Sequence, residues 1–134
     1  GLVGGFIRSS LLKNRIEIYG SDRKRSLIYV KDLVDIVHKI SYLENSSFQA
    51  YNIPSTSMLI KDLALKISNK NEKCELIFKK MPEKISSIDV PLLNLNTKKI
   101  FKKINHFEFR NIDQTLENTI EYFRKRILWF IELI

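Results

Sequence analysis

Cysteine, glycine and proline are all scarce in this chain of 134 residues, and each scarcity excludes a class of protein. One cysteine, Cys74, rules out an internal disulfide framework and leaves too few thiols for a zinc ribbon. Four glycines and three prolines rule out a collagen-like chain and a disordered chain rich in these residues. No run of about 18 apolar residues occurs, so we expect no transmembrane helix and no membrane partner. Residues 1–6 lack the features of a signal peptide, and we expect a cytoplasmic protein.

The composition that remains is that of an ordinary globular domain. Hydrophobic residues make up 44% of the chain and charged residues 28%, and the length suits one domain at most. The net charge of +8 is compatible with a nucleic-acid partner. However, lysine, isoleucine and asparagine are the residues that an A/T-rich coding sequence supplies. Aromatic residues do not alternate with basic ones as in RNA-binding surfaces, so we expect no nucleic-acid partner from charge alone.

Apolar spacing divides the chain into alternating helices and strands, which predicts an α/β or α+β domain. We expect Asp32 to cap the second helix and Thr56 or Ser57 to cap the third, and Pro54 to end the strand before it. The predicted helices are 6–13, 32–43, 57–67, 97–104 and one after Asp113, the predicted strands are 15–19, 25–30, 49–53 and 75–78, and residues 80–93 are expected to be irregular.

The last residues differ from the rest of the chain because they are apolar on every side. Residues 1–127 are therefore predicted to form one lobe, and residues 128–134 an apolar tail. Two interpretations of the tail stay open. It packs on this or a partner domain, or it is an exposed patch through which the chain associates.

The order of several short motifs is more informative than any one of them. A helix is followed by Ile-x-Ile-Tyr-Gly and Arg-Ser-x-Ile-Tyr-Val-x-Asp-Leu-Val within residues 16–34, then by Tyr-Asn-Ile at 51–53 and Thr-Ile-Glu-Tyr-Phe at 119–123. This arrangement resembles the carboxyl-terminal, substrate-binding part of the extended short-chain dehydrogenase/reductase family, the NAD-dependent nucleotide-sugar epimerases and dehydratases. The resemblance covers residues 2–127 and implies a role in nucleotide-sugar or cell-surface polysaccharide biosynthesis.

Two hallmarks of that family are missing from the chain. Its members bind NAD(P) on an amino-terminal Rossmann domain that carries a Gly-x-x-Gly-x-x-Gly loop and a catalytic Tyr-x-x-x-Lys pair, and neither motif occurs here. The resemblance therefore implies a substrate-binding lobe of a Rossmann-type enzyme without its dinucleotide-binding half. We expect no catalytic residue, no bound cofactor and no metal in this chain, and a Rossmann domain as its partner in cis or in trans. The chain is then a cloned fragment, a split gene product or a remnant.

The resemblance also implies which residues meet a nucleotide diphosphate sugar. Arg25 is expected to bind the pyrophosphate, because a guanidinium group can hold two phosphate oxygens at once. The strand with Glu17, Ile18 and Tyr19 is expected to lie along the nucleotide base, partly through its main chain. Asn52 stands where the family has a Tyr-Asn-x-Gly segment.

Two further candidates lie after the last predicted strand. Family members often have Arg-x-Gly-Asp there, and this chain has Lys80 and Glu83 in the outer positions. Lysine is a poorer bidentate donor than arginine, so ordinary loop charges are the favoured interpretation of this pair.

Two alternatives of another kind remain open: a small basic module that binds nucleic acid, and a remnant without function. The sequence names neither the base, the sugar nor the reaction, whether epimerisation, dehydration, decarboxylation or reduction.

Overall fold

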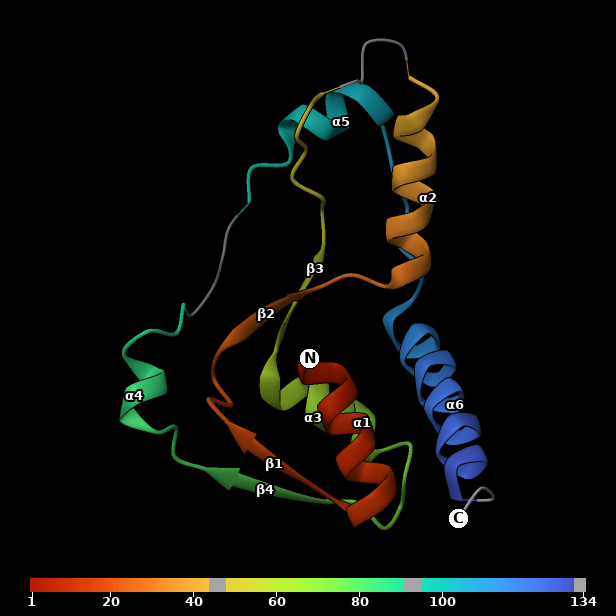
Figure 1. Ribbon diagram of the computed structural model, residues 1–134. Helices are drawn as coiled ribbons and strands as arrows, with labels where there is room; N and C mark the ends of the chain where they lie inside the picture. Colours follow the sequence, from red (N-terminus) through yellow and green to blue (C-terminus); the bar gives the residue numbers. More distant parts are fainter. Residues whose placement is uncertain (44–47, 91–94, 132–134) are drawn as a thin grey trace.

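The computed structural model describes residues 1–43, 48–90 and 95–131, and of residues 127–131 the helical backbone alone. Along these residues helices and short strands alternate as the sequence predicts (Figure 1). The elements are α1 (Leu2–Lys13), β1 (Arg15–Tyr19), β2 (Lys24–Leu27), α2 (Val30–Ser41), β3 (Thr56–Leu59), α3 (Ile60–Ser68), β4 (Glu75–Lys79), α4 (Glu83–Ser86), α5 (Lys98–Ile104) and α6 (Ile112–Ile131).

The strands pair in two ribbons of two. β1 and β4 are parallel, with Ile16 opposite Leu76. β2 and β3 are antiparallel, with Arg25 opposite Met58. A parallel pair needs a long crossover, and here the crossover includes α2, β3 and α3. The second ribbon connects the region of β1 and β4 to the region of α2 and α5 (Figure 1).

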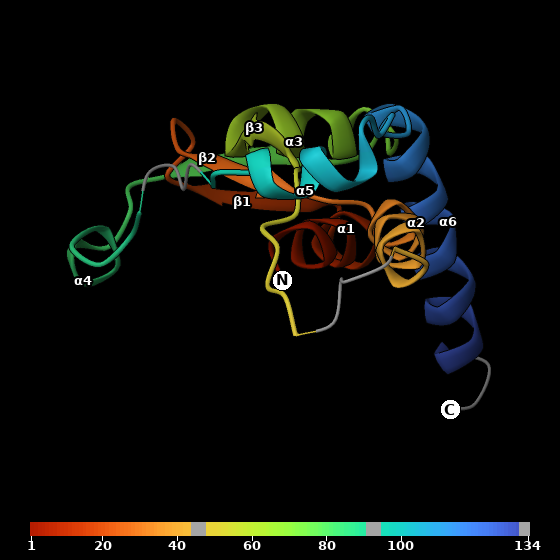
Figure 2. The ribbon, with the colours of Figure 1, turned by 90° about the horizontal axis from the view of Figure 1, so that it is seen from above.

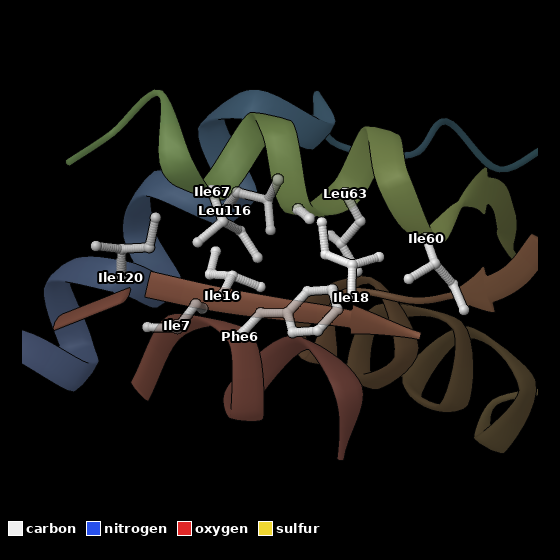
Figure 3. Close-up of a cluster of buried hydrophobic side chains, with 10 residues drawn as sticks. Phe6, Ile7, Ile16, Ile18, Ile60, Leu63, Ile67, Leu116 and Ile120 are labelled. Carbon is white, nitrogen blue, oxygen red and sulfur yellow. The ribbon is translucent and has the colours of Figure 1, made fainter. Parts of the chain in front are cut away.

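The larger hydrophobic core surrounds β1. Ile16 and Ile18 alternate with polar neighbours along this strand and are fully buried. Figure 3 shows their side chains between those of α1 and α3, with the side chains of α6 at one end of the cluster. The buried members of this cluster are Phe6, Ile7, Ile16, Ile18, Ile60, Leu63, Ala64, Ile67, Leu116 and Ile120.

A smaller core holds α2 against α5. Ile36 and Ile100 are fully buried in it together with Phe107 from the connection after α5. Apolar spacing predicts Ile100 on the inner face of the helix at 97–104, and this is confirmed, since Lys102 and Lys103 are exposed on its other side. The apolar spacing of the second helix predicts Leu33, Ile36, Val37, Ile40 and Leu43 on one inner face. Val37 is 54% exposed, so its predicted place on this face is wrong.

The predicted strand at residues 49–53 does not form. Tyr51 and Ile53 pack against the smaller core instead, and the strand lies at Thr56–Leu59, where it pairs with β2. The third helix accordingly begins at Ile60, and neither Thr56 nor Ser57 caps it. Apolar residues in a short run fit a strand and a packed loop equally well, and the pairing partner decides between them.

Two expected helix boundaries also shift. α2 begins at Val30, with Tyr29 at its N-cap position, so Asp32 lies in its first turn and is not the cap. α6 begins at Ile112, and the side chain of Asn111 accepts hydrogen bonds there from the amides of Asp113 (2.9 Å) and Gln114 (3.3 Å).

The expected irregular segment at 80–93 contains the short helix α4. α6 continues to Ile131, into the predicted tail, and residues 132–134 lie outside the described part. Along that described part, no helix combines the length and the apolar character that a membrane span requires.

Candidate functional site

Ligands of α/β sheets bind beyond the carboxyl ends of parallel strands, and β1 and β4 present such an edge. Tyr19 and Lys79 are paired in register at these ends, so the segments that follow them lie side by side. After β1 the chain turns at Gly20 towards β2, and after β4 it passes Met81 towards α4. Figures 1 and 2 show α4 beyond the arrowheads of both strands, apart from the other helices.

Two arginines converge on one carboxylate at this edge. Arg25 Nη2 lies 2.5 Å from Asp89 Oδ1, and Arg23 Nη1 lies 3.3 Å from Asp89 Oδ2. The side chain of Asp89 is 15% exposed, and those of Arg23 and Arg25 are 19% and 31% exposed. Two guanidinium groups face one carboxylate, so the cluster keeps a net positive charge in a partly desolvated position, where electrostatic attraction is stronger than in water.

Main-chain oxygens and one serine hydroxyl accept the other hydrogen bonds of these guanidinium groups. Arg25 Nη1 donates to the carbonyl oxygens of Lys24 (2.9 Å) and Val90 (3.2 Å). Arg23 donates to the carbonyl oxygen of Asp89 and to Ser86 Oγ, each at 3.4 Å. The segment from α4 to Val90 is thus attached to β2 and the turn before it through the two arginines.

Gly20 makes the turn between β1 and β2 possible. Its φ of +60° is a left-handed conformation that glycine adopts without steric cost. A Cβ atom at this position would lie 2.5 Å from Met81 Cε and 3.0 Å from Arg23 Cγ. The Arg23 amide donates to the Gly20 carbonyl oxygen at 2.9 Å, which closes the turn and directs the Arg23 side chain towards Asp89.

Glu17 and Tyr19, both predicted to lie along a base, form a polar group with Lys79. Lys79 Nζ lies 2.9 Å from Glu17 Oε1, and Tyr19 Oη donates to Glu17 at 3.5 Å. The hydrogen bond from Lys79 lowers the pKa of Glu17 below its ordinary value of 4.5 and raises the pKa of Lys79 above 10.5. The two charges offset each other, so this pair adds no net charge to that of Arg23, Arg25 and Asp89.

The other predicted residues are distributed around this edge or away from it. The side chain of Ile18 is fully buried in the core, so only its main chain could meet a ligand. Lys80 and Glu83 are exposed and flank Met81 next to the Gly20 turn. Asn52 lies elsewhere. Its amide donates to the carbonyl oxygen of Asn96 at 3.0 Å, just before α5, and Figure 1 places α5 at the opposite end of the molecule from β1 and β4.

Arg23 and Asp89 were not among the residues predicted from the sequence. The run Arg23, Lys24, Arg25 is basic throughout and resembles a solvated turn. Arg23 lies in the turn before β2, so no alternating strand pattern indicates it. Asp89 is 64 positions from Arg25 in a segment without periodic pattern, so no local signal indicates it.

A separate cavity of about 330 Å³ opens where α1, the start of α2 and α6 meet. Its wall is mostly apolar, and Asp32 and Arg110, both on the wall, pair with each other. This wall offers an anion less free positive charge than the arginine pair does. Among residues 1–43, 48–90 and 95–131, no group of three His, Cys, Asp or Glu side chains could hold a metal ion.

The sequence matches no protein-family model and no curated protein. Solved structures with a similar fold include UDP-glucose 4-epimerase with UDP-glucose from Thermotoga maritima, at 23% identity and a TM-score of 0.76, over 95% of this chain and 40% of that one. Epimerase Mth375 from Methanothermobacter thermautotrophicus is 14% identical with a TM-score of 0.82, over 98% and 39%. The NAD-dependent NDP-hexosamine 5,6-dehydratase TunA is 16% identical with a TM-score of 0.77, over 93% and 40%.

These likenesses confirm the predicted fold class. The chain spans about two fifths of the length of the solved structures that it matches. It therefore has the mixed α/β fold of the carboxyl-terminal part of NAD-dependent epimerase and dehydratase structures.

Proposed function

We propose that this chain is the carboxyl-terminal, substrate-binding portion of an NAD-dependent nucleotide-sugar epimerase or dehydratase. The observation that supports this proposal best is the pair of arginines, Arg23 and Arg25, holding a carboxylate beyond the carboxyl ends of β1 and β4. The fold, shared with enzymes of this kind, is the second support.

The arginine pair fits a pyrophosphate for a physical reason. A guanidinium group is planar and always charged, and it presents parallel N–H groups that match two oxygens of a phosphate. The Asp89 carboxylate supplies two oxygens to the pair in the same way, so it stands in for an anionic ligand. Each charge-assisted hydrogen bond is worth about 1.5–3 kcal/mol.

In the complete enzyme this portion orients the sugar and takes no part in bond breaking. Binding energy at the nucleotide end holds the sugar in place at the reacting end, which lowers the entropic cost of reaction. Tyr19, 39% exposed at the end of β1, and the main chain beside it would then meet the base.

The glycines near the start of the chain do not form a dinucleotide-binding loop. A phosphate-binding loop needs free backbone amides around its glycines, whereas Gly4 and Gly5 lie within α1 and the Gly5 amide donates to the Gly1 carbonyl oxygen at 2.9 Å. NAD would therefore be bound by a Rossmann domain that this chain does not contain, joined in cis or in trans.

Calorimetric titration of the full 134-residue chain with UDP-glucose and with pyrophosphate tests the proposal. We expect Arg25→Ala to lower the affinity for both ligands at least tenfold, which corresponds to the loss of about one charge-assisted hydrogen bond. Arg124→Ala is the matched control. Arg124 donates to the Lys70 carbonyl oxygen on another side of the fold, and removing it takes away the same charge.

The two variants separate local recognition from general charge. If both weaken binding equally, the ligand responds to net charge alone and the proposed site is wrong. If the parent chain binds neither ligand, or Arg25→Ala binds as tightly as the parent, the arginine pair does not bind pyrophosphate.

A further inference from the structure

We propose that Asp89 occupies the anion site as an internal ligand, and that an anionic substrate binds by displacing it together with the strap formed by residues 83–90. This inference rests on the proposed function, because it needs the arginine pair to be the anion site. It adds a conformational step to that site: the strap must open before a pyrophosphate can bind.

The geometry of Asp89 supports displacement. Its carboxylate meets both guanidinium groups, so these contacts and those of a pyrophosphate on the same N–H groups exclude each other. The hold is uneven. Oδ1 takes a short hydrogen bond from Arg25, whereas buried Oδ2, although 3.3 Å from Arg23 Nη1, has no hydrogen bond within the described residues. A buried oxygen without a hydrogen bond destabilises the closed strap.

The strap has main-chain hydrogen bonds of its own. The Ser87 amide donates to the Glu83 carbonyl oxygen at 3.0 Å, and the amides of Ile88 and Asp89 donate to the Ile85 carbonyl oxygen at 3.2 and 3.0 Å, all within the segment. None of these bonds involves an arginine, so leaving the arginines breaks none of them directly. Without that attachment a helix of one turn frays readily, and its amides then exchange faster.

Little apolar burial opposes the opening of the strap. Ile85, Ile88 and Val90 are 50%, 80% and 57% exposed, and the strap contributes no residue to either hydrophobic core cluster of the described chain. Figure 2 shows α4 projecting away from the layers of helices and strands. The contacts that attach the strap are chiefly those with Arg23 and Arg25, and these are the groups that a ligand would engage.

The consequence for affinity follows from the population of the open strap. A ligand that binds only the open form has an apparent affinity reduced by the open fraction. Asp89→Asn keeps the size of the side chain and removes its negative charge, so it should raise the open fraction and remove repulsion of the ligand. We expect Asp89→Asn to bind pyrophosphate about fivefold more tightly than the parent chain.

The test titrates the full 134-residue chain with pyrophosphate and compares Asp89→Asn with Glu121→Gln. Glu121 pairs with Lys125 on α6, so its variant makes the same change in net charge away from the site. Amide hydrogen exchange of residues 83–90, measured with and without pyrophosphate, reports on the strap directly. We expect pyrophosphate to speed this exchange in the parent chain, because it frees the strap.

Each outcome decides the inference. Tighter binding by Asp89→Asn but not by Glu121→Gln, with faster exchange in the ligand-bound parent, supports it. Weaker binding by Asp89→Asn shows that Asp89 positions the arginines for the ligand, and overturns it. Unchanged binding, or exchange that slows on binding, also overturns it while leaving the proposed function intact. If the parent chain binds no pyrophosphate, the proposed function fails first and the inference with it.

Discussion

Arg110 pairs with Asp32 of α2, which lies 78 positions earlier in the chain and has a side chain only 3% exposed. The main-chain amide of Arg110 also donates to the Asp32 carboxylate, at 3.4 Å. Nη2 of the Arg110 guanidinium group lies 2.6 Å from Asp35 Oδ2. Both hydrogen bonds raise the pKa of Arg110 further above its ordinary value, the bond to Asp35 more than that to Asp32. The pair fastens the connection before α6 to the first turn of α2.

Removing Arg110 should therefore destabilise the chain through Asp32. In Arg110→Ala the buried carboxylate keeps one weak bond to an amide, and a buried polar group without its partner costs about 1–3 kcal/mol. Asp35→Asn removes the other ion pair, in which Asp35 is 47% exposed, and should change stability little. Urea unfolding measures both. Equal losses of unfolding free energy in the two variants would show that the burial of Asp32 does not determine how much its pair with Arg110 stabilises the chain.

Substitution of Gly20 should perturb both stability and the arginine pair. In Gly20→Ala the left-handed conformation costs about 1–2 kcal/mol, and the new Cβ must displace Met81 and Arg23. Gly5→Ala is the opposite control, because a Cβ there meets nothing within 4 Å and lies inside α1. It should stabilise the chain by about 0.5–1 kcal/mol. Thermal melts of both variants test this, and a loss of stability in Gly5→Ala would contradict the prediction.

The ion pair between Glu17 and Lys79 should make stability depend on pH in a defined direction. The folded-state pKa of Glu17 is lowered chiefly by its hydrogen bond to Lys79, so its contribution is present above the unfolded value of 4.5 and is lost as pH falls through the folded value. The difference in unfolding free energy between the parent and Glu17→Gln should shrink as the pH is lowered from about 6 to about 3.

Lys79 gives the complementary prediction at high pH. Its pKa is raised above 10.5, chiefly by the hydrogen bond to Glu17, so its contribution is present below that value and is lost as pH rises through the folded one. Denaturant titrations at a series of pH values measure the unfolding free energy and test the predictions for both low and high pH. A difference between the parent and Glu17→Gln that grows on acidification would contradict the assignment of the pair.

Substitutions of two leucines in α3 distinguish the contribution of burial to stability from that of helix propensity. Leu63 is 1% exposed in the core around β1, and Leu65, two residues later, is 50% exposed. Leu63→Ala should cost about 2–5 kcal/mol, since it removes buried apolar area and leaves a cavity. Leu65→Ala should change stability by less than about 1 kcal/mol, because alanine is a good helix former and little burial is lost. Similar losses of unfolding free energy in the two variants, measured with urea, would show that Leu63 is not on the buried face of α3.

The sequence predicts the elements whose apolar pattern repeats. Residues 15–19 alternate, and they form β1 with Ile16 and Ile18 inward. The motifs around this strand also indicate the fold class and predict that Arg25 meets an anion. Such patterns are readable because the side chains of one face must be buried wherever that face packs.

Tertiary structure decided the features that depend on which distant residues meet. Residues 49–53 fit a strand by composition, yet β2 pairs with Thr56–Leu59, and only the geometry of the ribbon distinguishes these two segments. Asp32 fits a helix cap by its type, yet it is buried against Arg110. A polar side chain can hydrogen-bond to nearby main chain in several ways, and its long-range partner determines which contact forms.

The same division applies to the candidate site. The sequence by itself determined the elements with a clear apolar period, such as β1, together with the excess of positive charge and the expectation that Arg25 meets an anion. Only the tertiary structure joined Arg23 to Arg25 and placed Asp89 between them. Local patterns show which face of an element is buried. That Asp89 contacts Arg25, 64 positions earlier in the chain, depends on the packing of the whole fold.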